Sequence, residues 1–218
     1  IADMDGTPTG AYNIRANGAL AERKVTENVN IVNKADGSGI DIIIRPNTKN
    51  ETVHIPVVIN ASGLNDLVYN DFIIGENADV TIMAGCGIHN CGDEESRHDG
   101  IHTFFVGKNA KVKYIERHYG EGDGKGERNM NPTSVVNIAE GGYMEMETTQ
   151  IKGIDYTNRV TRATVEKGGT LIVHEKLMTH KNQHASTDFS VDFNGENASA
   201  NVVSRSVARG NSVQKYVS

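Results

Sequence analysis

Hydrophobic and polar residues alternate along much of the chain, and its windows lack the i, i+3, i+4 apolar stripe of an amphipathic helix. Alternating or β-branched runs at 41–44, 52–59, 112–114, 158–165 and 186–193 are typical of strands. Gly, Asn, Thr and β-branched residues, which disfavour helices, are frequent throughout. The pattern therefore predicts a protein built almost entirely from strands.

A strand–turn–strand motif recurs along the sequence. Its turn residues are separated by 32, 32, 27 and 29 residues, and they are Asn77, Asn109, Gly141, Gly168 and Asn197. Both residue types tolerate the positive φ of a tight turn. A period of this size indicates stacked coils. We therefore predict an all-β, parallel β-helix over residues 26–218, after a loop or lead-in segment at 1–25. An antiparallel sandwich is the alternative architecture.

Composition excludes several classes of function. The 218 residues carry a net charge of −6 with no basic stripe, and there is no Trp, so nucleic-acid binding is not expected. No apolar run approaches the roughly 18 residues of a membrane span, and no signal peptide is visible. Two cysteines give no disulfide framework, which favours a reduced, cytoplasmic protein. Because the sequence begins with Ile1, we expect the true N-terminus to lie upstream.

Both cysteines and three of the eight histidines fall between residues 86 and 102. Thiolate and imidazole are preferred ligands of zinc and of iron–sulfur clusters. The candidate metal ligands are Cys86, His89, Cys91, His98 and His102. Of these, the two cysteines are also the candidate cluster-binding residues. A thiol beside histidines can instead act as a nucleophile or a sulfur acceptor.

The flanking sequence predicts where this cluster lies. Runs at 79–83 and 103–106 read as strands, so we expect the cluster in the loop between two coils, where functional groups gather. The plainer alternative is a small buried Cys86 at a strand end, with unrelated loop histidines.

Other motifs carry weaker chemistry. Residues 3–7 read DMDGT and match the nucleophile motif of haloacid-dehalogenase-like phosphatases, but only two residues precede the first Asp. The glycine-rich run at 119–128 lacks the Lys-Ser/Thr of a phosphate-binding loop and predicts a flexible connection between coils. A carbohydrate-active enzyme would need paired carboxylates, for which Glu116, Glu145 and Glu147 are candidates.

Four segments together resemble the SufB/SufD family of iron–sulfur cluster assembly proteins. They read GCGIHN at 85–90, HDGIHTF at 98–104, VGKNAKVKY at 106–114 and NVVSRSVARGNS at 201–212. Their order and their register within the repeat carry the resemblance, which covers most of the chain beyond about residue 25. It implies a right-handed parallel β-helix, in agreement with the repeat.

The resemblance also implies a function. In that family SufB is a non-catalytic scaffold on which iron and sulfide are assembled, with the ATPase SufC and often with SufD. A core cysteine accepts sulfur, and Cys86 matches it; a histidine of the sulfur route matches His98. The implied cofactor is a transient iron–sulfur cluster. The implied partners are a SufC-like ATPase, a sulfur donor protein, and either a SufB/SufD-like partner or a second copy of this chain.

The sequence departs from the family in two respects. The family's proposed cluster ligands and its SufC-docking helical region lie beyond the segment matched by 208–212, so we expect either a C-terminally truncated piece or a reduced homologue. A lysine of the sulfur route is replaced near Thr133, while Cys91 offers an extra thiol. The alternative functions are a β-helix interaction module and a zinc-binding protein with no cluster role.

Overall fold

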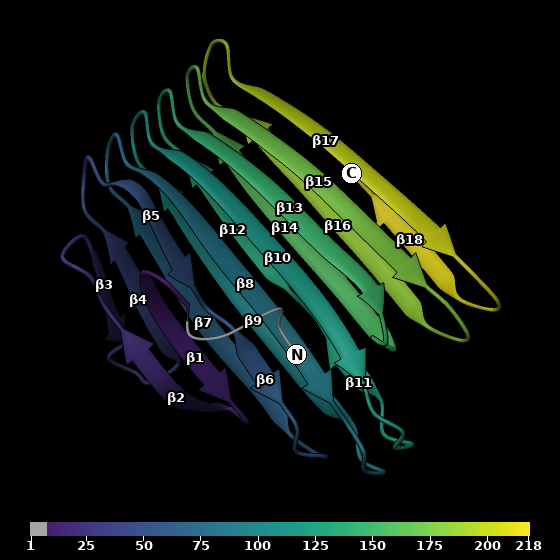
Figure 1. Cartoon of the computed structure of the whole chain (residues 1–218). Coiled ribbons are helices and arrows are strands. Elements are labelled where there is room, and N and C mark those ends of the chain that lie inside the picture. The colour runs from purple at the N-terminus through teal and green to yellow at the C-terminus, as the bar shows by residue number, and fades with distance from the viewer. Residues whose placement is uncertain (1–7) are drawn as a thin grey trace.

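The computed structural model describes residues 8–218 as two facing β-sheets wound into a parallel solenoid of about six turns (Figure 1). The first sheet contains β1 (Ala11–Ala16), β2 (Ala19–Lys24), β5 (Lys49–His54), β6 (Val57–Ile59), β8 (Asp79–His89), β10 (Lys111–Glu121), β13 (Tyr143–Lys152), β15 (Thr170–Thr179) and β17 (Ser199–Ala208). The second contains β3 (Val29–Asn33), β4 (Gly39–Ile44), β7 (Asn65–Ile74), β9 (Ser96–Val106), β11 (Arg128–Met130), β12 (Thr133–Ile138), β14 (Tyr156–Val165), β16 (His184–Phe193) and β18 (Val213–Val217). None of these described elements is a helix long and apolar enough to cross a membrane.

Each coil places one stretch of strand in each sheet, and the chain then moves on to the next coil. Within the first sheet, β8, β10, β13, β15 and β17 pair in parallel with their repeat positions in register. Val112, for example, lies opposite Val80 on one side and Met144 on the other. This arrangement confirms the predicted parallel β-helix and rules out the antiparallel sandwich.

The repeat turns also stack on one another. All five predicted turn residues have positive φ, from 54° at Asn109 to 66° at Gly141. Backbone hydrogen bonds link successive turns, as from the Asn77 N–H to the Lys108 carbonyl and from the Asn109 N–H to the Glu140 carbonyl. The backbone hydrogen bonds between neighbouring coils therefore continue through the turns. The repeat period follows from this stacking.

Inward-facing side chains divide the interior into zones along the strands. Next to the repeat turns lies a large apolar core built from both sheets, with Phe72, Phe104, Ile82 and Met144 among its members. A smaller apolar cluster includes Ile59, Ile88 and Met130. Between them runs a band of buried polar groups, here called the polar band, whose members include Asp66, Asn70, His98, His102, Glu116, His118, Arg159 and Glu175. Cys86 belongs to the smaller apolar cluster and borders this band.

The structure corrects three local predictions. The run 52–59 is split at Pro56 into β5 and β6, because proline has no N–H to donate to a neighbouring strand. The lead-in segment 1–25 contains two strands, β1 and β2, rather than loop alone. Of the cluster at 86–102, only Cys91 lies in a loop, since β8 and β9 leave only residues 90–95 outside strands. The strand expected at 79–83 instead continues to His89, with Cys86 and Ile88 both buried.

Candidate functional site

Cys86 lies on β8 with its side chain in the interior, 4% exposed. The parallel register places Val57 of β6 on one side of it and His118 of β10 on the other. The imidazoles of His118 and His98 both act on the Cys86 thiol and lower its pKa. His98 reaches the thiol from β9, in the facing sheet.

A carboxylate stands behind His98. Asp66 and His98 are Cα partners in the register of β7 and β9, so their inward side chains lie side by side. The Asp66 Oδ2 atom is 3.0 Å from His98 Nδ1, and its other oxygen accepts a 2.8 Å hydrogen bond from Arg15. The order is therefore Arg15, Asp66, His98, Cys86. A thiol, an imidazole and an orienting carboxylate in this order form the arrangement of an activated nucleophile.

The charges of this group support one another. Burial alone would raise the pKa of the Cys86 thiol, but the positive charge of His98 and the hydrogen bonds from His118 and His98 lower it to about 7. Burial would likewise lower the pKa of His98, but the Cys86 thiolate and Asp66 raise it to about 10. For Asp66, the hydrogen bonds from His98 and Arg15 outweigh burial and lower the pKa. Between about pH 7 and 10 the thiolate and the imidazolium therefore coexist.

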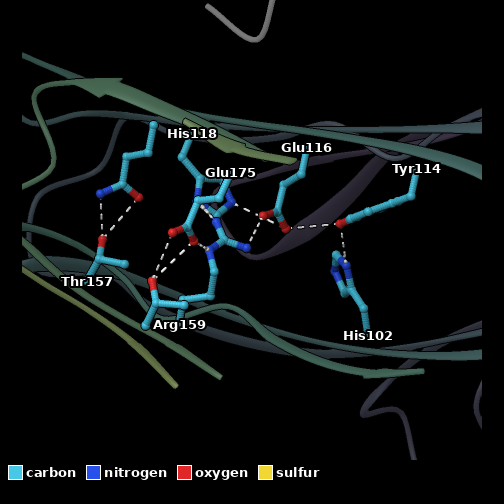
Figure 2. Close-up of polar contacts among 9 residues, drawn as sticks. His102, Tyr114, Glu116, His118, Thr157, Arg159 and Glu175 are labelled. Atoms are coloured by element: carbon cyan, nitrogen blue, oxygen red, sulfur yellow. Dashed lines mark hydrogen bonds and ion pairs between the residues drawn. The ribbon is translucent and has the colours of Figure 1, made fainter. Parts of the chain in front are cut away.

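The rest of the polar band is a connected network that crosses several coils (Figure 2). His102 Nδ1 lies 2.9 Å from the Tyr114 hydroxyl, which donates a 3.0 Å hydrogen bond to Glu116. Arg159 donates to the other Glu116 oxygen, and its Nε atom lies 3.5 Å from Glu175. Figure 2 shows Arg159 between the two carboxylates, so one guanidinium compensates two buried acids.

His102 has a different role from His98. Burial lowers the pKa of His102 to about 4, so it is neutral at pH 7. Because the Tyr114 hydroxyl already donates to Glu116, it accepts from His102, which assigns the proton to Nδ1. His102 Nε2 then accepts from the Asn70 amide at 3.3 Å. His102 is thus a neutral member of the network, whereas His98 is the cationic partner of Cys86.

The structure divides the five predicted ligands into two groups. Cys86, His98 and His102 belong to the interior, whereas His89 and Cys91 contact each other on the outside, at the end of β8. In residues 8–218, no group of three or more His, Cys, Asp or Glu side chains is arranged to hold a metal ion. The predicted ligands are therefore not assembled into one metal site here.

Several interior residues were missed by sequence reasoning. Asp66, His118 and Arg159 were not singled out, and Arg15 lies in the segment expected to be a lead-in. A signal was present, because Asp66 and His118 continue the inward alternation of β7 and β10. Extending each strand's alternation to its end would have found both residues. The contact between Arg15 and Asp66 joins elements distant in sequence and carries no such signal.

The remaining candidates do not join the interior thiol. Glu116 is buried in the polar band, while Glu145 and Glu147 are partly exposed beside Lys113. Glu116 therefore does not face either of the other two as the paired carboxylates of a carbohydrate-active enzyme would. The glycine-rich run becomes the end of β10, the connection at 122–127 and the start of β11. The DMDGT motif at 3–7 lies outside the described residues.

Comparison with known proteins gives consistent matches. A family model described as the SUF system FeS cluster assembly, SufBD core domain, matches residues 57–218. An iron–sulfur cluster assembly SufBD family protein of Archaeoglobus fulgidus is 25% identical over 146 residues, which cover 67% of this chain and 38% of that protein. A similarly named protein of Methanocaldococcus jannaschii is 27% identical over 161 residues, covering 73% and 50%. No solved structure gives a match.

The chain thus spans half or less of the length of these two relatives. The family model, however, covers most of the chain, including β8 to β18 with every coil that carries Cys86, His98 and His118. The stacked coils and the matched core domain together lead to one conclusion: this chain belongs to the SufBD family of SUF-system iron–sulfur cluster assembly proteins.

Proposed function

We propose that this chain is a non-catalytic, cytoplasmic component of iron–sulfur cluster assembly that accepts sulfur at Cys86. The observation that carries the proposal is the order of groups in the interior. His118 is the register partner of Cys86, His98 acts on the Cys86 thiol from the facing sheet, and Asp66 lies behind His98. Thiolate is the form of cysteine that attacks sulfur, and a neighbouring imidazolium stabilises it.

The transfer step balances without an added oxidant or reductant. The Cys86 thiolate attacks the outer sulfur of a persulfide on a donor. A new S–S bond forms at Cys86 as the donor's S–S bond breaks, and the donor cysteine leaves as a thiolate. The product carries its negative charge on the terminal sulfur, beside the His98 imidazolium. The sulfur retains its oxidation state, and the chain acts as a carrier rather than as a catalyst.

Iron and sulfide are the cargo in this proposal, and the interior residues fit sulfur loading better than cluster binding. Cys86 supplies one thiolate, and His98 is already engaged by Asp66. Cys91 lies on the outside, so β8 would have to rearrange for both cysteines to hold one cluster. We propose that the remaining ligands come from a SufB/SufD-like partner or a second copy of the chain, with a SufC-like ATPase driving assembly.

Persulfide mapping tests the acceptor. After anaerobic incubation with inorganic polysulfide, the Cys91→Ser chain is expected to gain one sulfur atom at Cys86, detected by alkylation and peptide mass spectrometry. The Cys86→Ser, Cys91→Ser chain is expected to gain none, which controls for non-specific sulfur. Failure of Cys86 to carry sulfur in the folded Cys91→Ser chain would overturn the proposal.

Reconstitution with iron and sulfide gives a second test. Because the described interior offers one thiolate and residues 8–218 contain no assembled ligand set, the chain alone is expected to form no stable cluster under anaerobic conditions. Its visible spectrum should match that of the Cys86→Ser chain. A strong thiolate-to-iron charge-transfer band that is lost in Cys86→Ser, but kept in Cys91→Ser, would show instead that the interior holds a cluster unaided.

A further inference from the structure

A second group of reactive side chains lies on the outer surface, away from the polar band. Cys91 Sγ is 3.0 Å from His89 Nε2, and His89 Nδ1 is 3.3 Å from a carboxylate oxygen of Glu121. Cys91 is exposed, and the other two side chains are more than a third exposed. Thiol, imidazole and carboxylate thus follow one another in hydrogen-bonding order. This is the order of an activated nucleophile, its base and the group that orients the base.

The fold fixes this order. His89 is the last residue of β8 and Glu121 the last of β10, and the two are Cα partners in the parallel register. The second oxygen of Glu121 accepts a 3.1 Å hydrogen bond from the Tyr119 hydroxyl. Tyr119 in turn accepts a 3.0 Å hydrogen bond from Lys152 of the next coil. Three successive strands of the first sheet therefore hold the carboxylate in place.

The loop that carries Cys91 is held as firmly. Asn90 is fully buried; its side chain donates to the Glu94 carbonyl at 2.8 Å and accepts from the Gly92 N–H at 3.0 Å. The connection 122–127 packs directly beneath, and Gly122 makes this approach possible. Its φ is +115°, and a Cβ there would lie 2.1 Å from the Asn90 carbonyl oxygen. The glycine-rich run thus serves as a close-packed support for the Cys91 loop.

We propose that Cys91, His89 and Glu121 form a second, external thiol site that takes sulfane sulfur from a persulfide carried by a donor protein. The choice of substrate rests on the proposed function. Because Cys86 is buried and Cys91 is exposed, a persulfide held on another macromolecule meets Cys91 without any opening of the solenoid.

The step is balanced. His89 Nε2 takes the thiol proton as Cys91 attacks the outer sulfur of the donor persulfide, and Glu121 stabilises the resulting imidazolium. The donor's S–S bond breaks, the donor cysteine leaves as a thiolate, and Cys91 carries the new S–S bond. The positioned base is expected to raise the rate of sulfur transfer to Cys91 about tenfold to a hundredfold. A hundredfold is the lower end of the range that general base catalysis typically contributes.

The rate of sulfur loading tests this site in the full chain. In a Cys86→Ser background, inorganic polysulfide at neutral pH is expected to load Cys91, with the product mapped by peptide mass spectrometry. His89→Gln and Glu121→Gln should each slow loading by about tenfold or more. Glu94→Gln changes a carboxylate of the same loop outside the triad and serves as the matched control. This variant should load at the same rate as the Cys86→Ser parent. Free cysteine under the same conditions serves as the reference nucleophile.

The outcomes separate the two proposals. Equal rates in the Cys86→Ser parent and its His89→Gln and Glu121→Gln variants would overturn the external site, as would loading of Cys86 in the Cys91→Ser chain with no loading of Cys91 in the Cys86→Ser chain. Loading at Cys91 with none at Cys86 would support the external site and overturn the interior acceptor. The substitutions lie at the surface, and thermal unfolding of each variant confirms that a slower rate does not reflect a misfolded chain.

Discussion

Replacing Arg159 with methionine is expected to lower the free energy of unfolding by about 3–5 kcal/mol, because it leaves buried carboxylates without a countercharge. The Arg159 and Glu116 side chains are 8% and 2% exposed, and Arg159 also faces Glu175. Burial alone would raise the pKa of Glu116, yet Arg159 and the neighbouring histidines hold it well below its ordinary value. Without the guanidinium, Glu116 must either remain charged and uncompensated or take up a proton.

The same strand supplies a matched control. Arg162 lies three residues further along β14 and pairs with Asp188 at 2.9 Å, but both side chains are almost half exposed. Arg162→Met should therefore cost less than about 1 kcal/mol. Urea unfolding of both variants, followed by circular dichroism, measures the difference. Similar losses in the two variants would show that the interior network does not depend on the Arg159 charge. An Arg159→Met, Glu116→Gln chain should recover part of the loss.

Replacing His98 with glutamine is expected to raise the pKa of the Cys86 thiol from about 7 to the ordinary value of 9.0 or above. Burial raises this pKa, and the charge of His98 is the largest influence that opposes it. Ultraviolet absorbance of the thiolate, titrated in a Cys91→Ser background, reports Cys86 alone. His89→Gln is the control, because His89 contacts Cys91 and should leave the Cys86 titration where it was. An unchanged midpoint in His98→Gln would contradict the thiolate–imidazolium assignment.

The signs of the two shifts fix the pH range of the pair. The folded-state pKa of Cys86 is depressed, so its contribution to stability is complete above 9.0 and is lost as pH falls through about 7. The folded-state pKa of His98 is raised, so its contribution is complete below 6.5 and is lost as pH rises through about 10. The thiolate and the imidazolium therefore coexist between about pH 7 and 10. Sulfur acceptance at Cys86 should decline on both sides of that range.

The solenoid could be predicted from the sequence because its cause is local and repeated. Each Asn or Gly turn permits a positive φ, and the apolar residues beside it alternate on both flanking strands. A repeated signal survives errors in any one copy. Cys86 and His98 were singled out together through the resemblance, and the charge of His98 acts on the Cys86 thiol, while their part in sulfur transfer stays a prediction.

The remainder of the site depends on contacts that a linear pattern does not contain. Side chains alternate between the inside and the outside along each strand, and this alternation decides which of the five predicted ligands point into the interior. The loop expected at 86–102 left that alternation out of consideration. His98 and Asp66 are 32 residues apart and meet only because β7 and β9 are in register. Arg15 reaches the site from a segment that showed no repeat.

Cys86 is buried inside the solenoid, whereas Cys91 is exposed in the loop after β8, so the two thiols can be labelled separately. A bulky maleimide fluorophore should react at the exposed Cys91 and spare the buried Cys86, with no mutation needed. Such a chain would carry a reporter at the proposed external thiol site, while its interior thiol stays intact. Fluorescence anisotropy could then follow encounters with candidate partners in real time, independently of whether any sulfur is transferred.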